Sequence, residues 1–280
     1  MKPPVNAAAD VDPELIASTT RRLKLTIAYD GTPWRGWQSL PGGRTVQDEL
    51  NAAFEKVSGR ALRVQGSGRT DAGVHAFGQV AHADIPSSAR LTDEAWSIAL
   101  NACLPPSIRV LQAESVPDTF HARFDAIGKT YRYRIWRPRI FTPFENHRAW
   151  HLYGPLDEAA LARCAELLIG THNFGRLSAN RGDQSEVQRR LDPASTTRTL
   201  RSVEIRDLGD VLEIEVEGEG FLYKMVRLIV GTLIHIARGR ETTDWLRDLL
   251  TNPEGLQSNQ AAPAEGLYLV AVQYPEPVVK

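Results

Sequence analysis

Apolar and polar residues alternate along several stretches of this chain, and each such stretch predicts a half-buried strand. The clearest is the first, in which Leu23, Leu25, Ile27 and Tyr29 alternate with polar neighbours before an Asp-Gly turn signal. Strands of the same kind are expected at 61–65, 79–85, 108–116, 130–136, 198–205, 211–216 and 267–274.

A second pattern, with apolar residues three or four positions apart, predicts amphipathic helices. After Thr45, which has the residue type of an N-cap, Val46, Leu50 and Phe54 form an apolar face, and Gly59 ends the helix. Further helices are expected over 92–104, 156–170 (with Asp157 as its cap) and 223–238.

The order of these elements is similar in the two halves of the chain. Each half reads as strand, helix, two strands, helix and strand, which predicts an α+β fold of two similar domains. Each domain is expected to have an antiparallel sheet with helices on one face, and an active-site cleft between the domains. We assign 22–120 to the first domain, 121–280 to the second and 1–21 to a flexible N-terminal extension. Residues 178–197 are polar and predict a long loop.

Composition narrows the class of protein without identifying a function. The 280 residues are 42% hydrophobic and 24% charged, which is ordinary for a soluble globular protein. Cys103 and Cys164 lie in predicted helices, far from each other, and are expected to be reduced core residues. The N-terminal stretch lacks the apolar run of a signal peptide, and no stretch reaches the roughly 20 apolar residues of a membrane helix. A cytoplasmic protein is therefore expected.

The net charge of −1 does not by itself predict a polyanionic partner, but the charges are unevenly distributed. Between 123 and 139 six Arg or Lys residues accompany one acid, Asp125, and a second basic run extends over 189–201. Acids gather instead over 213–219. Such separation can give a neutral protein one basic face that binds nucleic acid, although charge runs are more often solvated strand faces.

The densest chemical signal is the loop GSGRTDAGVHAFG at 66–78, which holds one arginine, Arg69, and one carboxylate, Asp71. Glycines let the backbone turn tightly and let a ligand approach closely. The loop is not a phosphate-binding P-loop, because no Gly-Lys-Ser/Thr follows at the required spacing. It is not a dinucleotide-binding motif either, because Asp71 occupies the place of the third glycine of that motif. Taken alone, an Asp in such a loop is more often a turn-forming residue than a catalytic one.

Five stretches together resemble the tRNA pseudouridine synthase A family, whose bacterial members modify the anticodon arm of tRNA. The GRTDAGVHA loop at 68–76 is similar to the signature of that family. The other four follow in the order of the family: TIAYDGTPWRGWQ at 26–38, FHARFDAIGKTYRYRIW at 120–136, GFLYKMVRLIVGTLI at 220–234 and AEGLYLVAVQYP at 264–275. The resemblance extends over nearly the whole chain.

The resemblance implies roles for four residues. Asp71 matches the catalytic aspartate, and Arg69 matches the arginine that flips the target base and fills the space it leaves. Tyr131 matches the tyrosine that stacks on the target uracil. Arg227 matches the basic residue that pairs with the aspartate. Without the resemblance, Tyr131 would be interpreted as an ordinary core aromatic.

It also implies isomerisation of uridine to pseudouridine at tRNA positions 38, 39 and 40, with an aspartate nucleophile and base flipping. The reaction breaks the N1–C1′ bond and rejoins the uracil through C5, so atoms are conserved and no cofactor or metal is required. A guanidinium favours the ionised form of a neighbouring carboxyl group, which suits Arg227 as the partner of Asp71. Whether Asp71 attacks C1′, adds to the uracil ring or removes a 2′ proton stays open.

The implied partners are the anticodon stem-loop of tRNA and a second copy of the chain in a homodimer, with no membrane. Arg132 and Arg134, in the basic run, are expected to bind the RNA. Extruding a base costs a few kcal/mol, and stacking on an aromatic such as Tyr131 returns about 1–3 kcal/mol.

Three alternatives assign Asp71 a different role. His75 and His82 could join Asp71 in a metal site, but their spacing matches no compact zinc pattern. Asp71-Ala72-Gly73 resembles half of a dimeric aspartic protease, which normally has Thr or Ser after the Asp. The third alternative is a noncatalytic tRNA-binding protein or folding helper, in which Asp71 only shapes its loop.

Overall fold

The computed structural model describes residues 20–180 and 193–276. The predicted extension 1–21 lies outside this range except for its last two residues, which begin the first strand, and most of the predicted loop 178–197 also lies outside it. The strands are β1 Thr20–Tyr29, β2 Gln65–Gly66, β3 His75–Pro86, β4 Ile108–Val116, β5 Gly128–Trp136, β6 Trp150–His151, β7 Gly170–Asn173, β8 Thr197–Asp207, β9 Val211–Gly218 and β10 Leu267–Gln273.

Short and long helices connect these strands. The α-helices are α2 Val46–Ser58, α3 Asp93–Cys103, α4 Glu158–Leu168, α6 Pro193–Thr196, α7 Met225–Ala237 and α8 Thr243–Thr251, and the 3-10 helices are η1 Pro143–Glu145, η2 Gly175–Leu177 and η3 Ala264–Gly266. Helix α8 was not expected from the sequence.

The strands of the described residues form one sheet, in the order β4-β1-β3-β10-β5-β9-β8-β7, with β2 beside β3 and β6 beside β5. Within each half, the neighbours in this order are antiparallel. A short parallel pairing joins the halves, where Tyr268 and Leu269 of β10 lie opposite His75 and Ala76 of β3. The α+β class is therefore confirmed, and the strands expected in two sheets belong to a single one. The division into two domains stays a prediction.

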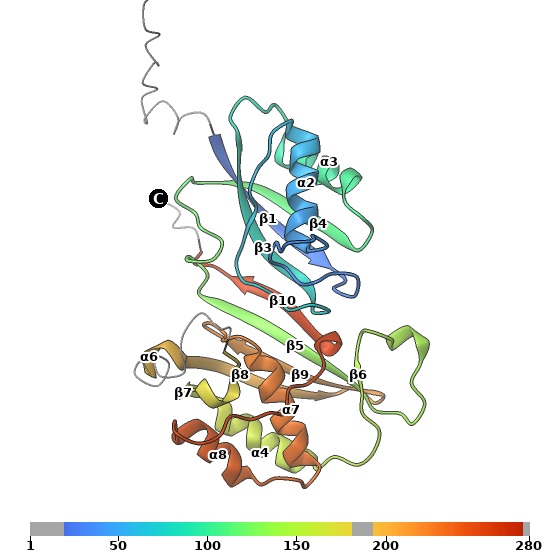
Figure 1. Ribbon diagram of the computed structural model, residues 1–280, viewed down its shortest axis with the longest axis vertical. Helices are drawn as coiled ribbons and strands as arrows, with labels where there is room; N and C mark the ends of the chain where they lie inside the picture. Colours follow the sequence, from blue (N-terminus) through green and yellow to red (C-terminus); the bar gives the residue numbers. More distant parts are fainter. Residues whose placement is uncertain (1–19, 181–192, 277–280) are drawn as a thin grey trace, which may run out of the picture.

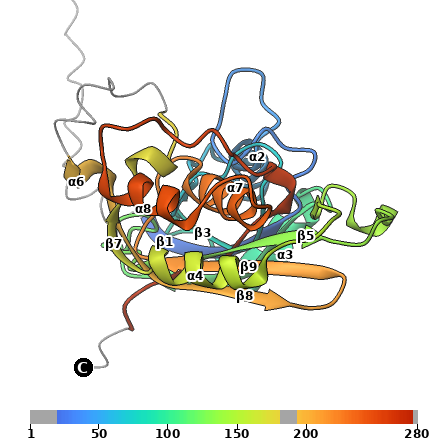
Figure 2. The ribbon, with the colours of Figure 1, turned by 90° about the horizontal axis from the view of Figure 1, so that it is seen from below.

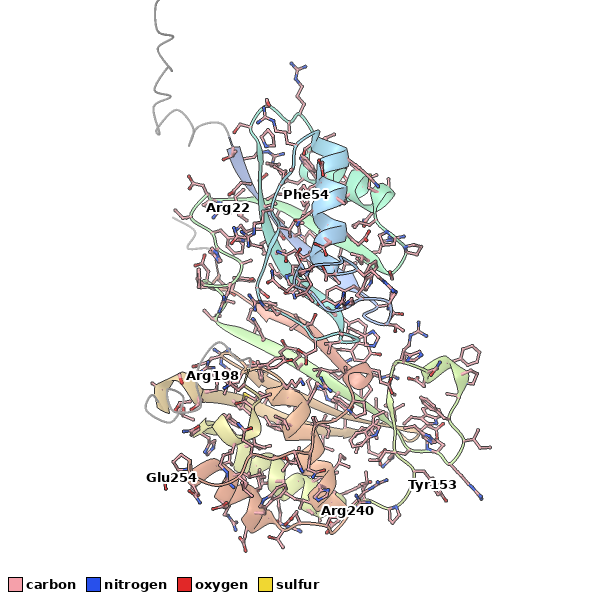
Figure 3. All side chains as sticks on the ribbon, viewed as in Figure 1. Arg22, Phe54, Tyr153, Arg198, Arg240 and Glu254 are labelled. Atoms are coloured by element: carbon pink, nitrogen blue, oxygen red, sulfur yellow. The ribbon has the colours of Figure 1, made fainter. Side chains whose placement is uncertain are left out.

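One face of the sheet is apolar because buried side chains alternate along its strands. Leu25 and Ile27 of β1 and Tyr133 of β5 are completely buried on it. Helices supply the rest of this core. For example, the ring centroids of Phe54 of α2, labelled in Figure 3, and Trp96 of α3 lie 5.6 Å apart. Figure 1 shows α2 and α3 beside the first half and α4, α7 and α8 beside the second, and Figure 2 shows α2 and α7 on the same side of the sheet.

The predicted helix at 45–58 begins as its sequence indicates, since Thr45 Oγ1 accepts from Asp48 N at 3.2 Å. The predicted strand 61–65, in contrast, is reduced to β2. Val64 N donates to Asn51 Oδ1 at 2.9 Å, and Val64 O accepts from Gln47 Nε2 at 2.7 Å. Side chains of α2 therefore bind this backbone in place of a neighbouring strand.

Helix α7 approaches the segment 258–262 closely because Gly231 has no side chain. A Cβ at Gly231 would lie 1.6 Å from the carbonyl oxygen of Gln260. The close approach lets Ala262 bind Arg227 twice: Ala262 N donates to Arg227 O at 2.9 Å, and Arg227 Nε donates to Ala262 O at 2.8 Å. Because residues four apart lie on one side of a helix, Gly231 helps to set the position of Arg227.

Gly231→Ala is expected to lower the free energy of unfolding by about 1–3 kcal/mol, because the added methyl group meets backbone and not a movable side chain. Urea unfolding followed by circular dichroism measures the change. In a helix with free space at this position, the same substitution raises the free energy of unfolding by up to about 1 kcal/mol. A decrease therefore indicates that the added methyl group meets the backbone of the neighbouring segment. An unchanged or higher stability would mean that α7 does not need this close contact.

Candidate active site

A hydrogen-bonded loop between β2 and β3 carries Arg69 and Asp71. Trp37 N donates to Thr70 O at 3.1 Å, and the Tyr29 hydroxyl lies 2.8 Å from Thr70 Oγ1. Burial raises the pKa of Tyr29 to about 12, so its hydroxyl keeps its proton at neutral pH. The residue between Arg69 and Asp71 is thus fixed to β1 and to the loop that follows it.

A buried glutamine fixes the first part of the same loop. The side-chain amide of Gln79 donates to Gly68 O at 3.0 Å, and its oxygen accepts from Ser67 Oγ at 2.7 Å. Gln79 is fully buried in β3, so this small network holds the approach to Arg69 rigidly.

Asp71 is paired with Arg227, which comes 156 residues later in the chain. Arg227 Nη1 donates to Asp71 Oδ2 at 3.0 Å, and the two side chains are only 16% and 23% exposed. Because Ala262 holds the other side of the guanidinium, the pair has a fixed geometry. The Oδ1 atom of Asp71 accepts no hydrogen bond from any described residue, so one carboxylate oxygen is available to a substrate.

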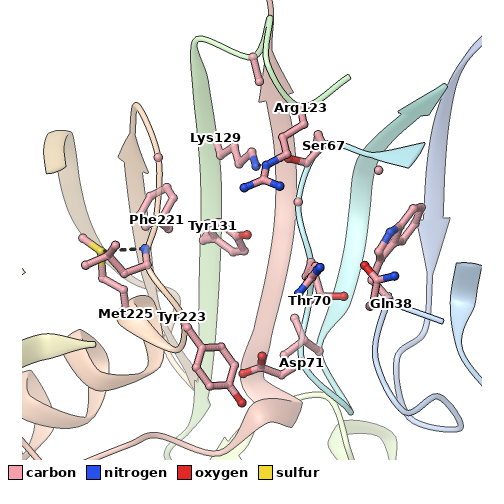
Figure 4. A pocket seen from close by; sticks show the side chains of 18 of the residues that line it. Gln38, Ser67, Thr70, Asp71, Arg123, Lys129, Tyr131, Phe221, Tyr223 and Met225 are labelled. Atoms are coloured by element: carbon pink, nitrogen blue, oxygen red, sulfur yellow. Dashed lines mark hydrogen bonds between the residues drawn. The ribbon is translucent and has the colours of Figure 1, made fainter. Parts of the chain in front are cut away.

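A cavity of about 450 Å³ opens beside this pair, within the size range of small-ligand pockets, about 300–1,000 Å³. Residues of both halves of the chain line it, and Figure 4 shows Asp71, Tyr131 and Tyr223 around one space. Its described lining contains two acids, Asp71 and Glu219, and seven basic residues, which are Arg63, Arg69, Arg123, Lys129, Arg198, Lys224 and Arg227. The cavity is therefore suited to an anionic ligand, although the whole chain has a net charge of −1.

Alternation along β5 decides which of its side chains reach the cavity. Tyr131 lines it and packs edge-to-face against Phe221, with 4.9 Å between ring centroids. Lys129, two residues earlier, lines it as well. Arg132 and Arg134 have the other parity, and successive side chains of a strand point to opposite faces of its sheet.

On that opposite face the two arginines are paired with acids. Arg132 Nη2 lies 2.9 Å from Glu215 Oε2, and Arg134 Nη1 lies 2.9 Å from Glu145 Oε2. Neither arginine lines the cavity. The structure thus brings Asp71, Arg69, Tyr131 and Arg227 together at the cavity, and Arg132 and Arg134 lie apart from them. The acidic run 213–219 belongs largely to β9, which pairs with β5 and so lies beside the basic run.

Arg69 is exposed at the cavity and makes no hydrogen bond or ion pair with any described residue. Its guanidinium is therefore free to contact a bound molecule.

Lys129 was not singled out from the sequence, yet it connects the halves at the base of the loop. Its Nζ atom donates to Ser67 O at 2.8 Å. A Cβ at Gly68 would lie 2.6 Å from the same Nζ atom, so the glycine leaves room for this lysine in its present position. Burial, with a smaller contribution from the charge of Arg123, lowers the pKa of Lys129 to about 8. The sequence could have indicated Lys129, because it lies two residues before Tyr131 of the predicted strand and so points to the same face of the sheet.

The two histidines considered for a metal site have other contacts. His75 Nδ1 accepts from Gly31 N at 3.0 Å and its Nε2 lies 2.8 Å from His147 O, while His82 Nδ1 accepts from Ala122 N at 3.1 Å. Neither lines the cavity that contains Asp71.

Comparisons with known proteins identify the family of the chain. The family model described as tRNA pseudouridine synthase matches residues 25–125 and 164–275. The chain is 46% identical to the tRNA pseudouridine synthase A of Akkermansia muciniphila over 91% of its own length and 96% of that protein. It is 42% identical to that of Geobacillus kaustophilus (91% and 95%) and 41% identical to that of Bacillus subtilis (90% and 99%).

The chain belongs to the tRNA pseudouridine synthase family. It is thus a pseudouridine synthase, an isomerase that needs a site for a nucleotide. The two segments matched by the family model carry Asp71 and Arg227, the two members of the ion pair. In the part of the chain that the structure describes, no helix has the length and apolar character needed to span a membrane.

Proposed function

We propose that this chain isomerises uridine to pseudouridine at positions 38, 39 and 40 in the anticodon stem-loop of tRNA. Asp71 is the catalytic nucleophile, and the target base is flipped out of the stem into the cavity. The main support is the Asp71–Arg227 ion pair on the wall of a basic cavity of about 450 Å³. The relatives named tRNA pseudouridine synthase A support tRNA as the substrate.

The atoms of the reaction balance without a second substrate. The N1–C1′ bond of uridine breaks, the uracil turns, and a C5–C1′ bond forms. The hydrogen of C5 leaves as a proton, and N1 gains one. An ionised carboxylate at the ribose, a site for the detached uracil and a means of extruding the base are sufficient for this chemistry.

The four site residues divide these tasks. Arg227 holds the Asp71 carboxylate in place through an ion pair of 3.0 Å. Tyr131 provides a ring on which the uracil stacks, and base–aromatic stacking is worth about 1–3 kcal/mol. Arg69, exposed at the cavity, occupies the space that the flipped base leaves in the stem. The other basic residues of the lining bind phosphates.

We also propose that the chain acts in the cytoplasm as a homodimer, with one tRNA touching both subunits. Gel filtration tests the assembly. An apparent mass of one chain without tRNA, and of one chain plus one tRNA with it, would count against the dimer and would leave the reaction itself unaffected.

Release of tritium from tRNA that carries 5-³H-uridine tests the proposed reaction, because isomerisation must expel the hydrogen of C5. Fully unmodified tRNA should release tritium, and chemical mapping should find pseudouridine at positions 38–40. A noncatalytic tRNA-binding protein would bind the same tRNA and release none. Release with pseudouridine elsewhere would support the reaction and contradict the target positions.

Lys129→Gln is expected to weaken tRNA binding and to remove a pH dependence near pH 8. Burial lowers the pKa of Lys129 to about 8, so its positive charge is present below pH 8 and lost above it. A nearby phosphate favours the charged form, so the affinity of the wild-type chain should fall up to about tenfold between pH 7 and 9. Filter binding at constant ionic strength measures this.

The variant should bind tRNA with little change over the same pH range. Arg134→Gln, which removes a charge from the opposite face of the sheet, should keep the wild-type pH dependence. Parallel pH curves for the wild-type chain and Lys129→Gln would show that Lys129 does not contribute its charge to binding.

A further inference from the structure

The mouth of the cavity carries an exposed aromatic ring for which the proposed reaction has no role. Phe124, in the segment between β4 and β5, is 74% exposed although it is one of the residues that line the cavity. A single exposed aromatic on a surface needs no explanation. This one differs because the turn that carries it is held rigidly and lies beside the basic lining.

The turn is closed by hydrogen bonds of its own. His121 N donates to Asp125 Oδ2 at 2.8 Å, and Asp125 N donates to His121 O at 3.1 Å. The Nδ1 atom of His121 accepts from Arg123 N at 3.1 Å and from Phe124 N at 3.3 Å. The backbone that presents Phe124 therefore has little freedom.

Three side chains from outside the turn bind its backbone, one of them the buried His82. Ala122 N donates to Nδ1 of His82, which is 1% exposed, and the Tyr274 hydroxyl donates to Ala122 O at 2.6 Å. Arg22 Nη1 donates to Phe120 O at 2.7 Å. Polar side chains of β3, of β1 and of Tyr274, which directly follows β10, thus hold this turn.

The surroundings of Phe124 favour a nucleobase as its ligand. The His121 ring lies on one side, with 4.2 Å between the centroids, and the guanidinium of Arg123 lies 5.6 Å from the ring centre. Most of the Phe124 side chain remains open to solvent. An open aromatic face next to cationic groups is the arrangement with which proteins bind single-stranded nucleic acid, since bases stack on the ring and phosphates contact the cations.

We propose that Phe124 forms a second base-binding subsite, which stacks a nucleotide adjacent to the target uridine. Extrusion of the target base removes one stacking partner from each neighbouring base, and the ring of Phe124 replaces that lost contact for one of them. The site then binds two unstacked bases, the target at Tyr131 inside the cavity and its neighbour at Phe124 on the rim. This subsite rests on the proposed RNA substrate.

Steady-state tritium release from 5-³H-uridine tRNA by Phe124→Leu and Phe124→Tyr tests the subsite. Leucine keeps an apolar side chain without an aromatic face and should lower kcat/KM about 5- to 150-fold, which corresponds to the about 1–3 kcal/mol of one stacked base. Tyrosine restores the face and should remain within about twofold of the wild-type chain. Because Phe124 is exposed, neither change is expected to alter the melting temperature.

Phe144→Leu is the matched control, since Phe144 is 81% exposed but does not line the cavity. It should leave kcat/KM unchanged. Equal values for Phe124→Leu and the wild-type chain, or equal losses in the Leu variants at 124 and 144, would overturn the subsite and leave the proposed reaction intact.

Photocrosslinking separates failure of the subsite from failure of the proposed function. Anticodon-arm RNA with 5-iodouridine next to the target position should crosslink to Phe124, as identified by peptide mass spectrometry, and the yield should fall in Phe124→Leu. A crosslink without any tritium release would support the subsite and contradict the proposed reaction. RNA that binds without a crosslink at Phe124 would overturn the subsite whatever the activity.

Discussion

Asp71→Asn is expected to abolish pseudouridine formation while tRNA binding is retained. The amide has nearly the shape of the carboxylate but no negative charge with which to act at the ribose. Removal of a catalytic nucleophile typically costs about 10⁴-fold or more in kcat. Among the described residues of the lining, the variant also loses one of two acids and keeps seven basic residues, so its affinity for a polyanion should stay the same or increase. Tritium release and filter binding measure the two effects separately.

Asp93→Asn provides a matched control. Asp93 also pairs with an arginine, Arg21, at 3.0 Å, but it does not line the cavity. Its replacement should leave turnover within about twofold of the wild-type value. Tritium release by Asp71→Asn within tenfold of the wild-type rate would show that Asp71 is not the nucleophile.

Arg227→Gln is expected to lower kcat by about 100- to 1,000-fold, the usual effect of removing one preorganised electrostatic contact from an active site. Glutamine provides no positive charge, so the Asp71 carboxylate loses both its partner and the group that fixes its orientation. Arg227→Lys should retain more activity, although a single ammonium group reproduces the two-sided contact with Asp71 and Ala262 poorly. Single-turnover tritium release measures the chemical step.

Arg134→Gln controls for the loss of a paired arginine elsewhere. Arg134 makes two hydrogen bonds to Glu145 on the opposite face of the sheet, so turnover should change less than twofold. If Arg227→Gln and Arg134→Gln reduce turnover equally, the loss reflects a general effect of removing an ion pair and not the contact of Arg227 with Asp71.

Local patterns predicted the elements that build this site. The alternation of Leu23 to Tyr29 and the cap at Thr45 appear in the structure as β1 and the start of α2. These features depend on residues that are near one another in sequence, so a window of a few residues contains the necessary information. The strand expected over 61–65 failed for the complementary reason, because Asn51 and Gln47 of α2 bind that backbone.

The basic segment shows where a pattern in the sequence becomes ambiguous. Alternation along β5 implied that Lys129 and Tyr131 share one face and that Arg132 and Arg134 share the other. It did not indicate which face borders the cavity. The neighbouring strands β9 and β10 decide which face borders the cavity. They place acids opposite the two arginines, and they bring the Asp71 loop close to Lys129.

The sequence by itself determined the α+β class, most element positions and the family, and through the family it indicated Asp71 and Arg227 as partners. Only the tertiary structure decided that their side chains meet at 3.0 Å, that β10 lies between β3 and β5, and that Gly231 lets α7 reach Ala262. The physical reason is distance along the chain. Contacts between residues 156 positions apart form only when the sheet, the helices and the loops pack together, and no local pattern encodes that packing.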